Sequence, residues 1–415
     1  MTRLFSPQNA KVLKKKQLRS KKQDTRTMTM PFTRRLLSSS RINRATTTTI
    51  ASVIFPSSRY LCSTFTDEDD EENIRRKLEA SFERVLHSPT EKNNNSTTLL
   101  ERLFSKGYAV IENEGFDANI GRELRREIDA LPFERFVPNS TRFIKDGTQT
   151  ELVKKNIREV SAPFEEVDGR YLNALQKDRT LLTLMNVLKP SETPSEMLFN
   201  VSLKLQINDG ENARFPIHFD SDSSTDQRRW TCLVYLNDEW EERDGGEVVL
   251  YLPFQEEKRI VVPPKMGTVV MFNSRYVAHS TLPFKGKRRL MFTIWLHAKG
   301  GMDNGNAEKK TTAEMEKESN TSSKSVEMDA QEQLEKLLAP EQRKHLMKLM
   351  LAEEWAESIA EAHDRSSEST ARALKTHWEE IDIIARVLGQ AFPLAFERLE
   401  KLIKSGEISD FPLKF

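Results

Sequence analysis

Two histidines and one aspartate have the types and spacing of metal ligands. His218 and Asp220 stand two residues apart in the run Ile217-His218-Phe219-Asp220. If this run is a β-strand, both side chains lie on one face and start about 7 Å apart at the backbone. His279, further along the chain, could complete a set of three from an adjacent strand. A bare His-x-Asp also arises by chance, and its alternative role is that of a hydrogen-bonded histidine in a strand.

Two imidazoles and one carboxylate on one side of an octahedral ion leave three positions open, which is typical of non-haem Fe(II) oxygenases. Arg289 opens the last long strand pattern and shares a face with Thr293 and Trp295, because the separations are even. Its guanidinium suits a planar carboxylate, which it can bind through two parallel hydrogen bonds. Tyr235, in a neighbouring strand pattern, could add a hydroxyl. Alone, Arg289 could be a surface ion-pair residue and Tyr235 a core aromatic.

The elements that must position these side chains are short strands. From residue 201 the hydrophobic pattern has a period of two, and turn residues such as Gly245-Gly246 and Pro263-Pro264 divide it. Strands at this spacing indicate a sandwich, barrel or jelly roll. The predicted strands are Val201–Ile207, Phe215–Asp220, Arg229–Asn237, Glu247–Leu252, Arg259–Val262, Thr268–Phe272 and Arg289–His297. Helical patterns precede them, including one across Tyr171–Leu188, although residues 133–200 are otherwise hard to interpret.

At these residues the sequence resembles a known family. The shared text is Leu103–Glu114, Thr231-Cys232, Tyr235-Leu236-Asn237, Trp240, Gly245-Gly246, His279, Gly286-x-Arg288-Arg289 and Thr293-x-Trp295. It resembles the Fe(II)/2-oxoglutarate-dependent dioxygenase superfamily in its prolyl 4-hydroxylase-like branch, and most of all the catalytic domain of hypoxia-inducible-factor prolyl hydroxylases. The resemblance covers residues 99–299. It implies an α+β fold with a double-stranded β-helix (jelly-roll or cupin-like) core, N-terminal supporting helices and a separate C-terminal helical segment.

The resemblance also implies roles for single residues. His218, Asp220 and His279 would bind catalytic iron, and Arg289 would bind the distal carboxylate of 2-oxoglutarate with help from Tyr235 and Thr293. Arg288 competes with Arg289, but the even offset to Thr293 and Trp295 favours Arg289. One departure concerns a tyrosine that family members often carry about ten residues before His-x-Asp. Here Gln206, Ile207 and Asn208 occupy that region.

The expected activity is hydroxylation of a C–H bond, most of all of a prolyl residue in a protein. The cofactors would be Fe(II), 2-oxoglutarate, O2 and L-ascorbate, and the partner a protein or peptide substrate. The alternatives are another side chain or a small molecule as substrate, or a non-catalytic iron-binding scaffold. A zinc hydrolase on a cupin-like barrel gives no reason for the pattern of Arg289, Thr293 and Trp295.

Charge divides the 415 residues unevenly. Residues 1–66 hold 14 Lys and Arg and only Asp24 as an acid, whereas the rest carries 50 basic and 62 acidic groups. The segment Met28–Phe65 is rich in Arg, Ser and Thr, which is typical of an organelle transit peptide. We therefore expect mitochondrial import and a mature chain that begins near residue 62. Another organelle is the alternative, as is a nuclear or cytoplasmic protein with a basic tail.

The remaining composition excludes several classes. The mature part is acidic and no window approaches the ~20 apolar residues of a membrane helix, so we expect neither a nucleic-acid nor a membrane partner. Two cysteines cannot form a disulfide framework. The predicted divisions are a targeting segment 1–65, an acidic helix and linker 66–98, the dioxygenase domain 99–299, a flexible linker 300–327 and a helical region 328–415. The last is expected to form a helical hairpin that packs on itself or mediates association, with substrate recognition as the alternative.

Overall fold

The computed structural model describes residues 71–88, 98–112, 115–145, 148–165, 168–189, 196–221, 226–255, 257–298, 329–396 and 398–399. These residues belong to one compact unit, Asp69–Phe415. The predicted targeting segment and the predicted linker 300–327 lie outside the described residues. Within the described part of the chain, no helix has both the length and the apolar character needed to cross a membrane.

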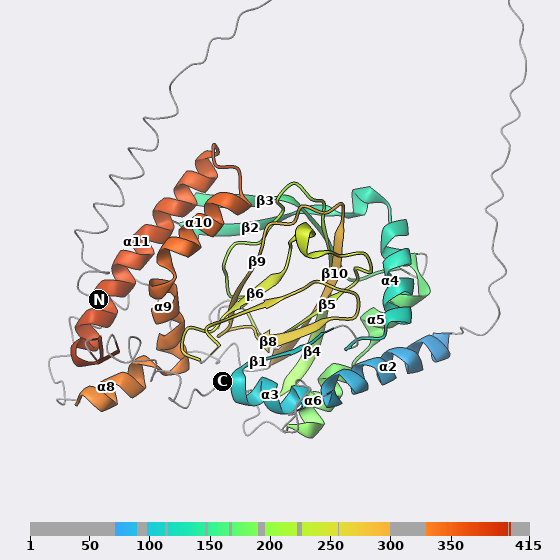
Figure 1. Cartoon of the computed structure of the whole chain (residues 1–415), viewed down its shortest axis with the longest axis horizontal. Helices are drawn as coiled ribbons and strands as arrows, with labels where there is room; N and C mark the ends of the chain where they lie inside the picture. The colour runs from blue at the N-terminus through green and yellow to red at the C-terminus, as the bar shows by residue number, and fades with distance from the viewer. Residues whose placement is uncertain are drawn as a thin grey trace, which may run out of the picture. The chain divides into compact units, whose positions relative to one another are not determined.

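The larger sheet is antiparallel and contains most of the strands (Figure 1). Across the described residues its order is β1-β8-β5-β10-β4-β3-β2. The bounds are Tyr108–Ile111 for β1, Val137–Lys145 for β2, Thr148–Ser161 for β3, Leu198–Asn208 for β4, Arg228–Tyr235 for β5, Val269–Asn273 for β8 and Arg289–Ala298 for β10.

A smaller antiparallel sheet faces it and has the order β7-β6-β9. Its strands are β6 (Val248–Tyr251), β7 (Arg259–Val262) and β9 (Ala278–Thr281). One apolar cluster joins side chains of both sheets, among them Tyr235 and Phe272 from the larger sheet and Leu250 from the smaller one. Two facing antiparallel sheets with a shared core form a jelly-roll-like architecture, consistent with the predicted core.

The period of two sets which side chains enter the space between the sheets. On β10, Leu290, Phe292 and Ile294 pack with the helices on the outer face of the larger sheet. Met291 belongs instead to the cluster between the sheets. Because alternate side chains share a face, Arg289 points into the inter-sheet space with Met291.

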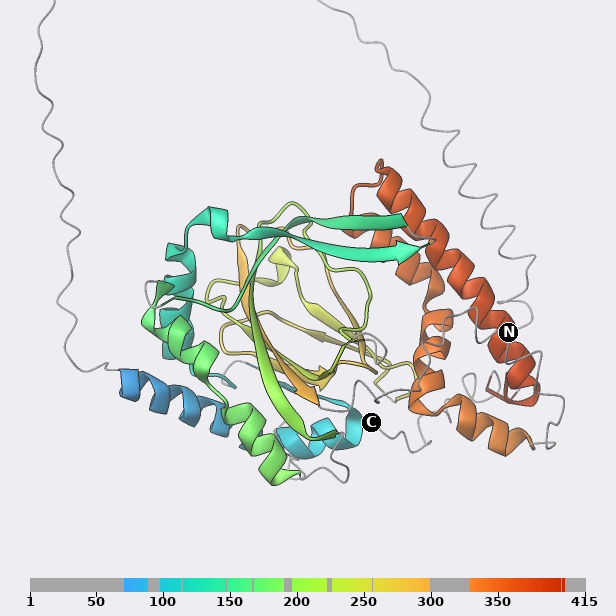
Figure 2. The same cartoon turned by 180° about the vertical axis from the view of Figure 1, so that it is seen from behind.

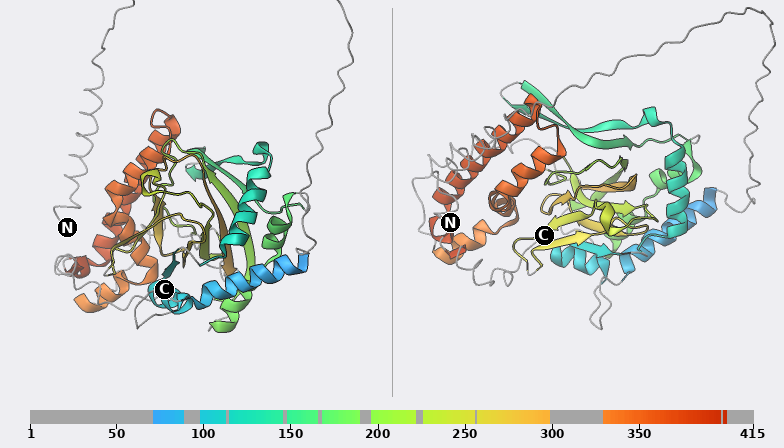
Figure 3. Two further views of the ribbon diagram at one scale, coloured as in Figure 1. Left: turned by 45° about the vertical axis from the view of Figure 1, so that its right-hand side comes forward. Right: turned by 45° about the horizontal axis from the view of Figure 1, so that its top comes forward.

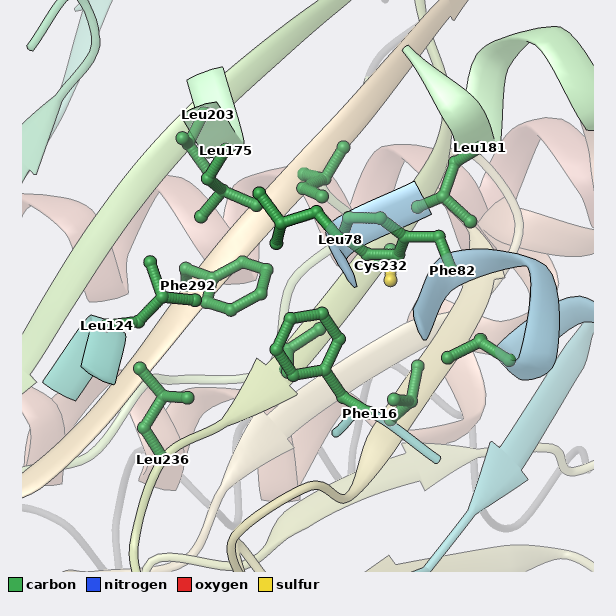
Figure 4. Packing of buried hydrophobic residues seen from close by; sticks show 14 of the residues in the cluster. Leu78, Phe82, Phe116, Leu124, Leu175, Leu181, Leu203, Cys232, Leu236 and Phe292 are labelled. Carbon is green, nitrogen blue, oxygen red and sulfur yellow. The ribbon is translucent and has the colours of Figure 1, made fainter. Parts of the chain in front are cut away.

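The N-terminal helices cover the outer face of the larger sheet, as the views from different sides agree (Figures 1 and 3). They are α2 (Glu71–His87), α3 (Leu99–Lys106), α4 (Ala118–Ala130), α5 (Arg170–Lys177) and α6 (Thr180–Leu188). Figure 4 shows their apolar side chains, such as Leu78, Phe82 and Leu124, meeting Phe292 of β10 and Cys232 of β5. This layer fixes the sheet that carries Arg289.

The C-terminal helices lie on the other side of the sheets (Figure 3). They are α8 (Ala330–Leu337), α9 (Pro340–Met350), α10 (Ala352–Ala362) and α11 (Glu368–Ala391). We expected a hairpin that packs on itself, but the described residues form four helices. The helices also contact the strands: Arg372 of α11 donates a hydrogen bond to the Thr150 hydroxyl of β3 at 3.3 Å.

The structure differs from the strand prediction at two places close to the candidate ligands. Phe215–Asp220 is not a continuous strand, since it forms one isolated bridge, between His218 and His279, and one further backbone bond, between Phe215 and Thr281. His279 itself lies on β9, a strand that we did not predict. The bridge places His218 beside β9 all the same, so both histidines come from one edge of the smaller sheet.

Two further differences fall in residues 133–200, where the pattern is weak. The hairpin β2–β3 was not predicted, and it extends from the larger sheet towards α10 and α11 (Figure 2). The helix expected over Tyr171–Leu188 is interrupted, because the backbone leaves the helical region at Asp178 between α5 and α6. The Asp178 carboxylate accepts hydrogen bonds from the amide and hydroxyl groups of Thr180 and so begins α6.

Candidate metal centre

The structure brings His218, Asp220 and His279 together. One ligand atom from each lies within 4.8 Å of the others. The Nε2 atoms of His218 and His279 are 3.4 and 3.6 Å from the same Asp220 oxygen, Oδ1. His279 faces the inter-sheet space, because it pairs with Leu250 on β6 and directly paired residues share a face. Two imidazoles and a carboxylate at these separations form a suitable ligand set for one divalent ion.

The second Asp220 oxygen is held by the protein. Oδ2 accepts hydrogen bonds from the Thr231 hydroxyl at 2.6 Å and from the Trp295 indole at 3.0 Å. Burial by itself raises the pKa of Asp220, but the imidazoles of His279 and His218 and the Thr231 hydroxyl outweigh it and hold this pKa well below its usual value. The carboxylate is therefore ionised, with Oδ1 left to face the histidines.

Backbone carbonyls orient both imidazoles. The Nδ1 atom of His218 lies 2.8 Å from the Pro216 carbonyl, and that of His279 lies 3.4 Å from the Val277 carbonyl. When Nδ1 carries the proton that it donates there, the Nε2 lone pair is free for a metal. Burial and the nearby His218 lower the pKa of His279 to about 4, so His279 is neutral at physiological pH.

Aromatic rings pack against the two imidazoles from outside. Phe272 of β8 lies 4.4 Å from the His279 ring, centroid to centroid, and Phe215 stacks on His218 at 5.8 Å. The two imidazole centroids are themselves 4.3 Å apart. Neither phenylalanine was identified from the sequence, since an aromatic residue in a strand pattern is more often a core residue. In the structure they restrict the rotation of the candidate ligands.

Arg289 lies inside the protein without a carboxylate partner. Its side chain is 1% exposed, and its three side-chain nitrogens find no hydrogen-bond partner among the described residues. The guanidinium carbon sits 5.0 Å from the centre of the Tyr235 ring, and the Tyr235 hydroxyl also lacks a partner within that described part. A buried guanidinium with unused donors is costly unless an anion completes it. These residues therefore fit a carboxylate ligand.

Gly246 makes room for this arginine. It adopts a positive φ of 79°, and a Cβ placed on it would come 3.0 Å from the Arg289 Cδ and 2.9 Å from the Phe284 ring. A larger residue would push the guanidinium away from its position. The Gly245-Gly246 pair seen in the sequence is thus part of the geometry around Arg289.

Arg288, the competing candidate, has a different environment. It is about 39% exposed, and its guanidinium pairs with Asp129 at 3.1 Å and with Asp209 at 3.4 Å. Thr293 is 3% exposed and lies on the face of β10 that Arg289 occupies. The structure thus places Arg289 and Thr293 on the inner face and Arg288 at the surface.

Two amide side chains were missed as candidates for this pocket. Asn208 pairs directly with Arg289 across the β4–β10 ladder, so their side chains share a face. Asn208 is fully buried, its Oδ1 accepts a hydrogen bond from Gln206 at 2.8 Å, and its Nδ2 has no partner among the described residues. The sequence signal was the absence of the tyrosine that family members often carry in this region. The amide pair adds an unused donor beside the guanidinium.

Two histidines of the C-terminal helices are also buried. His363 and His377 are 2% and 4% exposed. His363 stands at the C-cap of α10, where its ring bonds to the Ile359 carbonyl. His377 lies inside α11 and its Nε2 bonds to the Ala352 carbonyl of α10. His377 thus links α11 to α10, His363 caps its own helix, and both lie outside the ligand set.

Comparison with known families agrees with this geometry. Residues 203–297, which include the three candidate ligands and Arg289, match the model of the 2OG-Fe(II) oxygenase superfamily. The protein is a 2-oxoglutarate-dependent dioxygenase, and this family implies Fe(II), 2-oxoglutarate and O2.

Solved structures give the fold. A prolyl 4-hydroxylase from Phytophthora capsici is 24% identical, with a TM-score of 0.53, over 81% of this chain and 98% of that one. A Pseudomonas putida prolyl-4-hydroxylase is 23% identical over 49% of this chain and 98% of that one, with a TM-score of 0.37. A Trichoplax adhaerens prolyl hydroxylase in complex with a hypoxia-inducible-factor peptide is 15% identical over 56% and 96%, with a TM-score of 0.41. The P. capsici match shows that the domain shares the fold of that prolyl 4-hydroxylase.

Proposed function

We propose that His218, Asp220 and His279 bind Fe(II) through two Nε2 atoms and Oδ1. The supporting observation is that these atoms converge while every other polar atom of the three side chains is engaged or oriented by the protein. Hydrogen bonds from outside a ligand set fix its tautomers and its direction, which strengthens metal binding. Three protein ligands leave room at the ion for a cosubstrate and O2.

Arg289 would bind the distal carboxylate of 2-oxoglutarate in the same inter-sheet space. The guanidinium offers unused donors in a fork, and Tyr235, Asn208 and Thr293 lie on the faces that surround it. The bound carboxylate would pair with the guanidinium and so offset the cost of burying this positive charge. Its role is to hold the cosubstrate in one orientation, so that the opposite end faces the three ligands.

The reaction that we propose is hydroxylation of a prolyl residue in a protein or peptide. Bound Fe(II) would supply the activation of O2, with 2-oxoglutarate oxidised to succinate and CO2 as one oxygen atom enters the substrate C–H bond. The protein keeps Asp220 ionised, His279 neutral and the cosubstrate fixed by Arg289. Support for a prolyl substrate comes from the resemblance in sequence and from the prolyl 4-hydroxylase of P. capsici, whose fold the domain shares. L-Ascorbate would restore enzyme whose iron has oxidised.

Turnover with defined substrates tests this proposal. The iron-loaded full chain is incubated with 2-oxoglutarate and proline-containing peptides, and succinate is measured together with a peptide mass gain of one oxygen atom. His218→Ala should abolish both, because it removes a ligand. Turnover of a small molecule with none of any peptide would reject the prolyl assignment. Activity that survives in His218→Ala would place the metal centre elsewhere.

A further inference from the structure

Helix α10 packs against the segment that carries His218 and Asp220 and reaches β6, the neighbour of the strand that carries His279, although it lies far along the chain (Figure 1). One side of the helix contacts residues 214–219, which lead into Asp220, and the same helix also contacts β6 beside β9. The family match ends at residue 297, so it does not include this helix.

The central contact is made by Ser358. The Ile217 amide, one residue before His218, donates a hydrogen bond of 3.0 Å to the Ser358 hydroxyl. That hydroxyl donates in turn to the Trp355 carbonyl at 2.7 Å. Ser358 and Ile217 are 2% and 1% exposed, so water does not replace this bond easily. A side chain 141 positions later in the chain thus completes the backbone beside the first ligand.

Contacts on either side of Ser358 strengthen this attachment. The Trp355 and Phe219 rings pack with their centroids 5.8 Å apart. Glu361, one turn after Ser358, pairs with Arg214, whose side chain is only 12% exposed. One face of α10 therefore holds three of the six residues from 214 to 219, namely Arg214, Ile217 and Phe219. Residues 215–220 are bonded to β9 only at Phe215 and His218, so the contacts with α10 add to an incomplete strand pairing.

A second branch of contacts runs from α10 towards His279. The Tyr251 hydroxyl donates to the Glu354 carboxylate at 3.1 Å and lies 3.0 Å from the hydroxyl of Ser280, which follows His279. Arg259 of β7 pairs with the same carboxylate at 2.8 Å. The helix thus contacts the surroundings of both histidines.

We propose that α10 is a positioning element of the metal centre, with Ser358 and the linked Tyr251 as positioning residues that fix His218 and His279. The inference rests on the proposed Fe(II) site and extends it to the C-terminal helices. Loss of the Ser358 hydroxyl leaves a buried Ile217 amide without a partner, and the backbone shifts to find one. Since outer contacts orient metal ligands, that shift weakens metal binding.

The test uses the full chain and Co(II), whose ligand-field absorption reports coordination geometry. Ser358→Ala is compared with Glu357→Ala, a matched control on the adjacent, exposed position of α10. Tyr251→Phe removes the hydroxyl of the second branch but keeps the ring. Thermal unfolding of each metal-free variant is measured as well, so that a general loss of stability is separated from a change in metal affinity.

We expect the Co(II) dissociation constant to rise about 10-fold in Ser358→Ala and in Tyr251→Phe, with an altered absorption spectrum, at the lower end of what changes outside a ligand set cause. Glu357→Ala should match the wild type. A Co(II) dissociation constant and spectrum equal to wild type in Ser358→Ala would overturn the proposal. If Ser358→Ala does not fold, Tyr251→Phe decides in the same way.

Failure of the metal assignment itself would look different. In that case wild-type protein and His218→Ala would bind Co(II) alike, and the role of α10 would fall with the Fe(II) site. If His218→Ala loses Co(II) and both positioning variants keep it, only the role of α10 is refuted.

Discussion

At the scale of single residues, the inter-sheet space holds opposite charges in separate places. Asp220 is ionised between two imidazoles, while Arg289 keeps a positive charge next to Tyr235 and Asn208. Neither charge neutralises the other through a direct contact among the described residues. Such an arrangement is costly when empty and favourable when a cation and an anion are both bound.

Arg289→Met should weaken 2-oxoglutarate binding without lowering the stability of the metal-free protein. The variant loses charge-assisted hydrogen bonds worth about 3–4 kcal/mol together, so the KM for 2-oxoglutarate should rise at least ~100-fold. Because the unpaired guanidinium is replaced by an apolar chain, the metal-free variant should unfold at an equal or higher temperature. Arg288→Met, at the exposed neighbour, is the control and should leave the KM unchanged. An unchanged KM in Arg289→Met would remove Arg289 from the cosubstrate site.

Asn208→Leu tests the amide beside the guanidinium. Removing the unused Nδ2 donor should raise the KM for 2-oxoglutarate about 5- to 10-fold and leave kcat nearly constant, since one hydrogen bond contributes about 1 kcal/mol. Initial-rate kinetics at varied 2-oxoglutarate give the answer. A fall in kcat with no change in KM would show that Asn208 acts on another step.

Much of this residue-scale arrangement could be predicted. Even spacing placed Arg289, Thr293 and Trp295 on one face, and the same rule paired His218 with Asp220. The contacts of Asp220 with Thr231 and Trp295 could not be predicted, because they depend on which strands are neighbours. The unused donor of Asn208 could not be predicted either, since it depends on the register of β4 against β10.

At the scale of elements, the β2–β3 hairpin contains an unusual lysine. Lys154 is 7% exposed, and its ammonium group donates to Asn139 at 2.6 Å and to Thr141 at 2.9 Å. The same group lies 5.0 Å from the centre of the Phe215 ring, which stacks on His218. Burial, with a smaller contribution from Lys204, lowers the pKa of Lys154 to about 8.

This lysine should make stability depend on pH in a defined direction. The folded pKa lies below the unfolded value, so between about pH 8 and 10.5 the unfolded chain binds more protons and stability rises with pH. Relative to Lys154→Met, wild-type protein should gain on the order of 3 kcal/mol between pH 7 and pH 10. Urea unfolding of the metal-free protein measures it, with the exposed Lys155→Met as control. A constant difference across this range would contradict the buried charge.

The hairpin shows why some elements escaped sequence interpretation. Its pattern is partly inverted, because Val153 is about half exposed while the adjacent Lys154 is buried. Hydrophobic periodicity assumes that apolar residues face a core, and here the buried face is polar. The alternation of residues 215–220 predicted a continuous strand, which was wrong. Contacts with α10, the bridge to His279 and hydrogen bonds between Phe215 and Thr281 hold this segment.

At the scale of the whole molecule, charge divides the chain into a basic leader and an acidic remainder. We propose that residues 1–66 direct the protein to mitochondria. Fused to a fluorescent protein, they should give a mitochondrial signal. Replacing four cationic residues by alanine should abolish import. The four are Arg34, Arg35, Arg41 and Arg44. Native protein whose N-terminus is still Met1, or a nuclear or cytoplasmic signal, would reject this assignment.

The contact between Ile217 and Ser358 also has a consequence in time. A ribosome adds about 5–20 residues per second, so the 141 positions between them take roughly 7–30 s to synthesise. Both proposed iron ligands of the histidine type, His218 and later His279, are synthesised within that interval, before the helix that holds the Ile217 backbone. A chain that ends before α10 would then have the proposed ligands but not the helix that positions them. If the proposed site binds iron, we expect iron loading to follow the synthesis of α10.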